Sequence, residues 1–201
     1  MKFTLFLFLS CLYFSTSFAQ ESEDSPEADR VAFRERLDEQ KLNYEVPKGY
    51  EQLYRSYNAM MGTILLSGTR HQLRALKDSV FIYFAIFPID TTTAYINKMK
   101  KFGFRPKINV NYLQTGSDTL KYPITRNAPG VTRKKYNADV SGYYELPLKV
   151  SYNNQYERCR VAFIHKQNRA DVTLYFFYTR ASAASVEKHM KKVLKKIKFT
   201  A

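Results

Sequence analysis

The fold is decided by residues 157–179, which read ERCRVAFIHKQNRADVTLYFFYT. Two runs rich in β-branched and aromatic residues, 157–166 and 171–179, flank the polar stretch 167–170. Such runs are typical of strands, and a polar connection of four residues is a common hairpin loop. We therefore expect an antiparallel β-hairpin at this position.

A helix is expected directly after the hairpin. Ser182 or Thr179 serves as its N-cap, and the helix then extends to Lys198. Its apolar residues recur at helical spacing and form one face: Val186, Met190, Val193, Leu194 and Ile197. Lysines crowd the other faces: Lys188, Lys191, Lys192, Lys195, Lys196 and Lys198.

The segments before the hairpin alternate between strand and helix patterns. Residues 60–67, 108–114 and 143–150 resemble strands, and 79–87 is typical of a central strand that is covered on both faces. A helix is expected over 91–102, and 116–140 is interpreted as a long loop of a length that is often functional or mobile. This order predicts an α+β fold in which helices pack on one face of an antiparallel sheet.

The start of the chain has the features of a secretory signal peptide. A positive start at Lys2 precedes an apolar stretch at 3–14, and the small residues Ser17 and Ala19 occupy the positions that a signal peptidase reads. We expect cleavage after Ala19, although a lipid attached to Cys11 is an alternative. About a dozen apolar residues are too few to span a bilayer as a helix. The mature chain is therefore expected to be secreted or periplasmic, with no transmembrane helix and with Cys159 as its single cysteine.

Charge is distributed unevenly over the 201 residues, whose formal net charge is +14. Residues 20–40 hold eight acids and three arginines, whereas 41–201 hold 28 Lys and Arg against 10 Asp and Glu. We interpret 20–43 as an acidic segment, partly disordered or helical, and 44–201 as a single α+β domain. Ser25 and Pro26 predict the start of a short surface helix with a thin apolar stripe at Val31, Phe33 and Leu37.

Two basic clusters are the candidate binding residues of this chain. They predict contact with an acidic envelope protein, an acidic glycan or an anionic lipid surface, and the alternative is that they are solvated faces of a basic protein. Asp139 either shapes a turn together with Asn137 or faces the neighbouring basic residues in a binding loop. Nucleic acid is not expected, because no nucleic-acid motif is present and the leader directs the chain to export. The candidate residues are Arg133, Lys134, Lys135, Tyr136, Asp139, Lys188, Lys191, Lys192, Lys195 and Lys196.

Catalytic and metal-binding motifs are not found in the sequence. His71, His165 and His189 lack a partner at metal-ligand spacing, and no cofactor is implied because the glycines are isolated. His71 is expected in an exposed turn, His189 at the edge of the helix, and Cys159 in a structural role. The alternative is an envelope hydrolase whose site is assembled from distant residues, with Asp139, His165 or Cys159 in its cleft.

Several short motifs between residues 130 and 200 resemble small secreted proteins of unknown function from Bacteroidetes-type bacteria. The motifs are 136–139 (YNAD), 143–148 (YYELPL), 156–159 (YERC), 164–166 (IHK) and 174–179 (LYFFYT). The order of elements is also similar to that of PsbP/Mog1-like α/β domains, which serve as binding or assembly modules. These resemblances imply a Gram-negative envelope and a non-catalytic role, and they transfer no ligand or catalytic residue to this chain.

Overall fold

The computed structural model describes residues 26–54, 60–61, 64–65, 71–89, 92, 97–98, 100–101 and 122–200. The expected signal peptide, Cys11 and the strand expected at 108–114 lie outside these residues. Helices in the described part are α1 (Pro26–Glu39), α3 (Pro129–Tyr136) and α4 (Val186–Leu194). The strands are β1 (Leu42–Tyr44), β2 (Tyr50–Tyr54), β3 (Met60–Met61), β4 (Ile64–Leu65), β5 (His71–Ala75), β6 (Val80–Pro88), β7 (Thr125–Arg126), β8 (Val140–Leu146), β9 (Arg158–Lys166), β10 (Ala170–Tyr178) and β11 (Ile197–Phe199).

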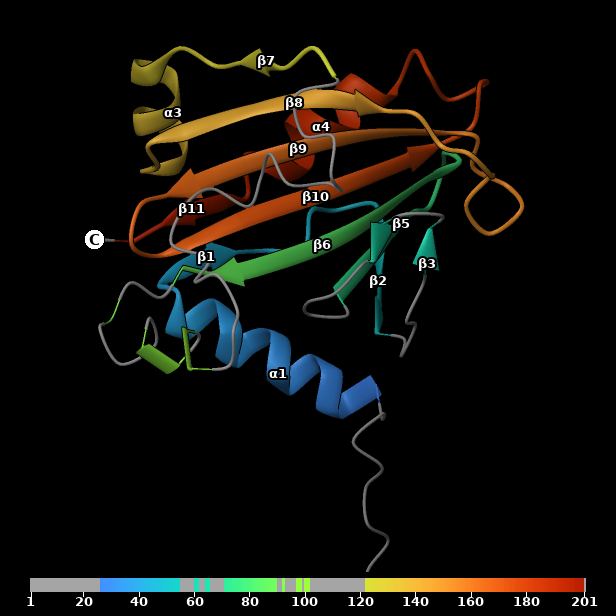
Figure 1. Ribbon diagram of the computed structural model, residues 1–201. Coiled ribbons are helices and arrows are strands. Elements are labelled where there is room, and N and C mark those ends of the chain that lie inside the picture. Colours follow the sequence, from blue (N-terminus) through green and yellow to red (C-terminus); the bar gives the residue numbers. More distant parts are fainter. Residues whose placement is uncertain are drawn as a thin grey trace, which may run out of the picture.

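A seven-stranded antiparallel sheet forms the centre of the molecule, with the strand order β2-β5-β6-β10-β9-β8-β7 (Figure 1). The predicted hairpin is confirmed, because β9 and β10 pair in antiparallel register from Ala170↔Lys166 to Tyr178↔Arg158. The central strand expected at 79–87 is also confirmed as β6, which pairs with β10 along its whole length. Every residue of β10 is buried, which explains why most of its positions are apolar instead of alternating between apolar and polar residues.

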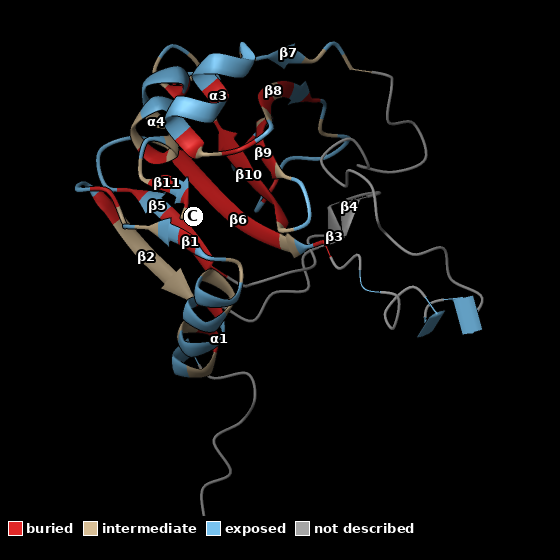
Figure 2. Ribbon diagram, turned by 90° about the vertical axis from the view of Figure 1, so that its left-hand side faces the viewer, coloured by how far each residue is buried: buried red, intermediate tan, exposed pale blue. Residues whose placement is uncertain are grey.

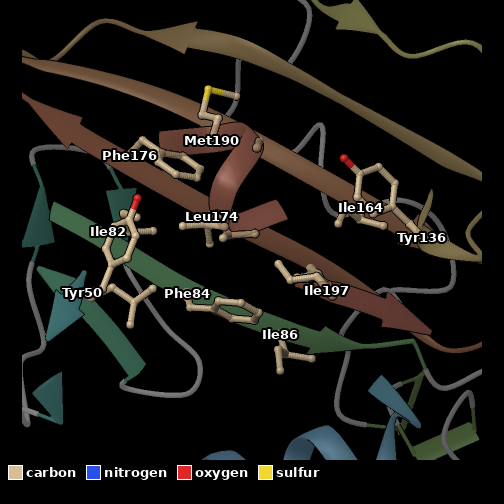
Figure 3. Close-up of a cluster of buried hydrophobic side chains, with 14 of the residues drawn as sticks. Tyr50, Ile82, Phe84, Ile86, Tyr136, Ile164, Leu174, Phe176, Met190 and Ile197 are labelled. Atoms are coloured by element: carbon tan, nitrogen blue, oxygen red, sulfur yellow. The ribbon is translucent and has the colours of Figure 1, made fainter. Parts of the chain in front are cut away.

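All three described helices contribute to the cluster on one face of this sheet (Figure 2). Phe33 of α1, Tyr136 of α3 and Met190 of α4 belong to one buried cluster together with the sheet residues Ile82, Phe84, Ile164, Leu174 and Phe176 (Figure 3). The expected α+β fold, with helices on one face of an antiparallel sheet, is therefore confirmed.

The opposite face of the sheet carries a second, strongly aromatic cluster. Tyr152 stacks on Phe177 with ring centroids 4.2 Å apart, and Tyr83 and Tyr175 meet edge to face at 6.3 Å. Tyr152 comes from the loop that links β8 to β9, and its backbone bonds to Tyr156 fold this loop back on itself. The sheet is thus buried on both faces, with many of the tyrosines used for packing.

The last predicted helix is four residues too long at its end, because it was expected to extend to Lys198. α4 ends at Leu194, and Ile197–Phe199 forms β11, which pairs antiparallel with β1. Ile197 and Phe199 are buried whereas Lys198 is exposed, the alternation of a half-buried strand. Sequence reasoning placed Ile197 on the helix because position 197 also fits the helical period.

The predicted loop 116–140 is wrong where it is described, because it contains β7 and the helix α3. Pro129 and Gly130 suggested a turn, but Pro at the first helical positions is compatible with a helix because its missing N–H has no intrahelical partner there. The run 60–67, expected as one strand, contains the two paired strands β3 and β4. The strand expected at 143–150 is β8, which begins and ends earlier.

Other expected elements are found near their predicted positions. The helix expected from Ser25–Pro26 is α1, and its Phe33 is 2% exposed in the core rather than at the surface. Asn97, Lys98, Lys100 and Lys101 are helical, in agreement with the helix expected over 91–102, whose other residues except Thr92 lie outside the described ones. Across the described segments, we find no helix long and apolar enough to cross a bilayer.

Candidate functional site

Helix α4 carries most of the candidate basic residues and packs on the sheet through its apolar side. Val186, Met190 and Val193 are buried at helical spacing against the core. Lys188 and Lys191 point to solvent from the opposite side, and Lys195 follows at the C-cap. Burial of one stripe therefore leaves a row of ammonium groups exposed along the other side of the helix.

His189 fixes the position of α4 relative to two distant segments. Its Nε2 lies 2.7 Å from Oδ2 of Asp78, and its Nδ1 lies 2.6 Å from the hydroxyl of Tyr50. Lys192 Nζ lies 5.4 Å from the centroid of the Tyr50 ring, within cation–π range. Burial, and then the charge of Asp78, raise the pKa of Tyr50 to about 12, so its hydroxyl stays protonated as a hydrogen-bond donor. His189, which was expected to pack at the edge of the helix, thus attaches α4 to Tyr50 and Asp78 by hydrogen bonds.

Helix α3 brings the second basic cluster next to the end of the chain. Its C-cap, Asn137, has a left-handed backbone with φ 50°, and Asn137 Nδ2 donates to the carbonyl oxygen of Phe199 at 3.1 Å. This bond ties the end of α3 to β11, which directly follows α4 in the chain. Arg133, Lys134 and Lys135 in the last turn of α3 are exposed.

We define the basic face as the exposed or half-buried Lys and Arg side chains of α3, α4, β11 and the link between α4 and β11, on the helix-covered side of the sheet. Two of its lysines have acidic partners: Lys191 Nζ lies 2.6 Å from Glu187 Oε1, and Lys196 Nζ lies 2.5 Å from Glu45 Oε2. In the described part of the chain, no carboxylate lies within 4.0 Å of Lys188, Lys195 or the other unpaired members. The face comprises Arg133, Lys134, Lys135, Lys188, Lys191, Lys192, Lys195, Lys196 and Lys198.

Two of the predicted binding residues do not belong to the basic face. Tyr136 is 6% exposed and packs in the core below α3. Asp139 accepts a 2.7 Å hydrogen bond from the backbone N–H of Gln167, and its own N–H donates to the His165 carbonyl at 2.9 Å. The Asp139 side chain therefore bonds to the distant turn between β9 and β10, and not to the neighbouring backbone as in the local turn that was one of its two expected roles.

His71 is not in an exposed turn, which corrects the expectation. It is completely buried in β5, stacks on Phe33 with centroids 4.0 Å apart, and contacts Tyr44 Oη at 3.1 Å and Gln52 Nε2 at 3.2 Å. Since the Gln52 amide donates to Nδ1, the ring is neutral with its proton on Nε2. Burial lowers the pKa of His71 to about 3. Its role is to satisfy polar groups inside the core.

His165 forms a buried pair with Asp171 on the neighbouring strand, with Nδ1 and Oδ1 2.6 Å apart. Burial alone lowers the pKa of His165, but the hydrogen bond and charge of Asp171, with smaller contributions from Gln167 and Asp139, outweigh it and raise the pKa overall. The two residues face each other directly across the β9–β10 ladder. This pair strengthens the turn end of the hairpin.

A pocket of about 620 Å³ lies where β8 and β10 end and β9 begins, near the start of α4. Glu145 joins two neighbouring strands here, accepting from Arg160 Nε at 2.5 Å and from the Tyr178 hydroxyl at 3.0 Å. Cys159 lines the pocket but is 1% exposed, and burial raises the pKa of its thiol, so it is kept as the neutral thiol.

The residues proposed for a hydrolase do not converge on this pocket. Cys159 lines it, whereas His165 and Asp139 are absent from its walls and lie at the other end of β9. Among the described residues there is also no group of three His, Cys, Asp or Glu side chains that could hold a metal ion. The geometry therefore offers no support for a site built from Asp139, His165 and Cys159.

Sequence reasoning missed the groups that hold the basic face in place. Tyr50 and Asp78 lie 139 and 111 residues from His189, so no local pattern connects them to α4. Asn137 was recognised as a turn residue, but its bond to Phe199 required knowledge of β11.

Comparison with known proteins yields remote structural likeness. No family model matches the chain, and no curated protein matches it. Among solved structures, LpqN, a protein involved in cell envelope biogenesis of Mycobacterium tuberculosis, is 11% identical with a TM-score of 0.35. That similarity covers 80% of this chain and 83% of LpqN. A TM-score this low gives the likeness no weight for either fold or function.

Proposed function

We propose that this protein is a secreted or periplasmic, non-catalytic binding module of the bacterial envelope that engages an acidic partner through its basic face. The observation that carries the proposal is the clustering of nine cations, most of them without a carboxylate partner in the described part of the chain, on and between α3, α4 and β11. The leader-like residues 1–19 support export, since they have the pattern of a signal peptide.

The arrangement of α4 supports binding more than simple solvation. A helix held by His189, Asp78 and Tyr50 presents its lysines from a fixed backbone, which lowers the cost of ordering them on a partner. The three lysines Lys188, Lys195 and Lys198 have no acidic partner in the described structure, so an anionic surface can approach them without displacing one. Charge complementarity of this kind accelerates association and weakens with salt.

Chromatography on immobilised heparin, a soluble polyanion, tests this proposal. The protein is expected to be retained at low ionic strength and to elute as the salt concentration rises. Replacement of Lys188, Lys195 and Lys198 by Glu is expected to abolish retention at physiological salt while circular dichroism remains unchanged, because all three side chains are exposed. Capture from an envelope extract at low salt, followed by salt elution, then identifies the acidic partner.

Equal elution of the wild-type and triple-variant proteins would contradict the proposal, because the basic face would then contribute nothing to polyanion binding. Capture that resists high salt would likewise exclude a charge-based interaction.

A further inference from the structure

Large apolar side chains that are exposed to solvent are few in the described part of the chain. They are Val31 (43% exposed), Leu76 (64%), Val131 (40%) and Val150 (66%). Single exposed apolar residues are ordinary at protein surfaces. Their position is informative here, because Leu76 and Val131 each adjoin the basic face.

Leu76 lies beside the part of α4 that is anchored to the sheet. Its backbone N–H donates to the Gly49 carbonyl at 3.1 Å, and Gly49 lies close to the Lys192 ammonium, since a Cβ built on Gly49 would be 3.4 Å from Lys192 Nζ. Two residues after Leu76, Asp78 bonds to His189 of α4. Leu76 is therefore connected to the lysine-bearing helix through Gly49 and Asp78, with most of its side chain in solvent.

Val131 occupies the corresponding place on α3. It precedes Lys135 by four residues in the helix, so the two side chains are neighbours on one side of α3. Thr132 and Tyr136 point into the core instead, which leaves Val131 outside the packed interior. One exposed aliphatic side chain thus lies on α3 itself, and another lies in the turn between β5 and β6 that contacts α4.

We propose that the basic face docks on the surface of a lipid bilayer that contains anionic lipid, with Leu76 and Val131 entering the interfacial region. The proposal rests on the proposed function and names its partner. Eight of the nine cations of the face are lysines, whose ammonium groups on flexible stems suit a diffuse layer of headgroup charge better than the bidentate recognition typical of arginine. Cationic side chains attract anionic headgroups, while adjacent aliphatic groups gain by leaving water for the acyl boundary.

A soluble polyanion such as heparin offers charge but no apolar phase. Substitution of the exposed apolar residues therefore distinguishes a bilayer from a soluble polyanion as the partner. The experiment measures sedimentation of the chain from Gln20 onward, which retains every described element, with vesicles of phosphatidylcholine and with vesicles that also contain phosphatidylglycerol. Residues 3–14 are left out because they are apolar enough to bind vesicles by themselves. Elution from heparin is measured in parallel for each variant.

The wild-type chain is expected to bind the phosphatidylglycerol vesicles, to release them at high salt, and to ignore pure phosphatidylcholine. The double variant Leu76→Ser/Val131→Ser is expected to bind about tenfold more weakly, which corresponds to about 1.4 kcal/mol, while its elution from heparin stays unchanged. Val150→Ser is the matched control, since Val150 is equally exposed but lies in the loop after β8, and it is expected to alter neither measurement.

Retention on heparin without binding to anionic vesicles would overturn the bilayer as partner and leave the proposed function intact. Vesicle binding that is equal in the wild type and in the Leu76→Ser/Val131→Ser variant would overturn the docking geometry. Loss of binding to both heparin and vesicles would overturn the proposed function as well.

Discussion

At the scale of single residues, the polar groups inside the core explain more of the structure than the exposed polar groups do. His71, His165 and Asp171 are buried and paired, and each was either misplaced or left without a partner by sequence reasoning. Their partners lie on other strands, so the pairing becomes visible only when the sheet is assembled. The pKa values of the two histidines shift in opposite directions, because His165 has a carboxylate beside it whereas His71 contacts the Tyr44 hydroxyl and the Gln52 amide.

The lowered pKa of His71 predicts a loss of stability in mild acid. The unfolded chain takes up a proton near pH 6.5, whereas burial keeps the folded ring neutral down to about pH 3. The stabilising effect is therefore present above pH 6.5 and declines as the pH falls below it. From pH 7 to pH 5 the free energy of unfolding should fall by about 2 kcal/mol more in the wild type than in His71→Gln. Urea denaturation at both pH values measures this, and an identical decline in the two proteins would contradict it.

Gly142 marks the place where β7 and β8 approach most closely. A Cβ at this position would lie 2.4 Å from the Thr125 carbonyl oxygen and 2.8 Å from the Phe163 ring. Gly142→Ala should therefore lower the free energy of unfolding by about 1–3 kcal/mol, as overpacking does. Gly130→Ala is the control: it has no atom within 4 Å of an added Cβ and lies in α3, so it should be neutral or stabilising. Thermal unfolding of both variants measures this difference. A Gly142→Ala variant as stable as the wild type would contradict the close approach of the two strands.

At the scale of elements, helices and strands that follow a local sequence pattern could be predicted, whereas those that depend on pairing with a distant segment could not. The hairpin β9–β10 was predictable because both strands and their turn are contiguous in sequence. β11 was not, because its partner β1 lies more than 150 residues earlier and the alternation of only three residues is a weak signal. α3 was hidden by Pro129 and Gly130, because a Pro-Gly pair is a typical turn signal. The basic residues of α3 and α4 were found from composition, but their common face depends on β11 and Asn137.

The hydrogen bond from Asn137 to β11 is expected to stabilise the packing of α3 against β11. Asn137→Ala removes the donor to Phe199 and also places alanine at a left-handed φ of 50°. Asn168→Ala has the same backbone cost at φ 58° but removes only an exposed 3.4 Å contact with Gln167. The difference in free energy of unfolding between the two variants should be about 1 kcal/mol, with Asn137→Ala the less stable, since one partly buried hydrogen bond is worth about that much. Equal destabilisation in chemical denaturation would show that the tether contributes nothing.

At the scale of the whole molecule, the sheet separates two surfaces with different roles. One face is closed by aromatic packing around Phe177 and Tyr152, and the other is covered by helices whose outer sides carry the cations. Net charge and composition predicted a basic binding protein, but they did not predict where the charge gathers, since Lys48, Lys77 and Lys149 are exposed outside the defined face. The proposed function therefore depends on where the positive side chains lie and not on the net charge of the protein.

The most direct test of that dependence replaces each of two exposed lysines by glutamate, so that the net charge changes equally in both variants. Lys195 belongs to the basic face, Lys149 lies in the loop after β8, and both are exposed without a carboxylate partner in the described structure. The dissociation constant for heparin is measured over a range of salt concentrations for Lys195→Glu and Lys149→Glu. We expect Lys195→Glu to weaken binding at least fivefold at low salt and to flatten the salt dependence, and Lys149→Glu to resemble the wild type. Equal weakening in the two variants would show that net charge, and not the basic face, governs binding.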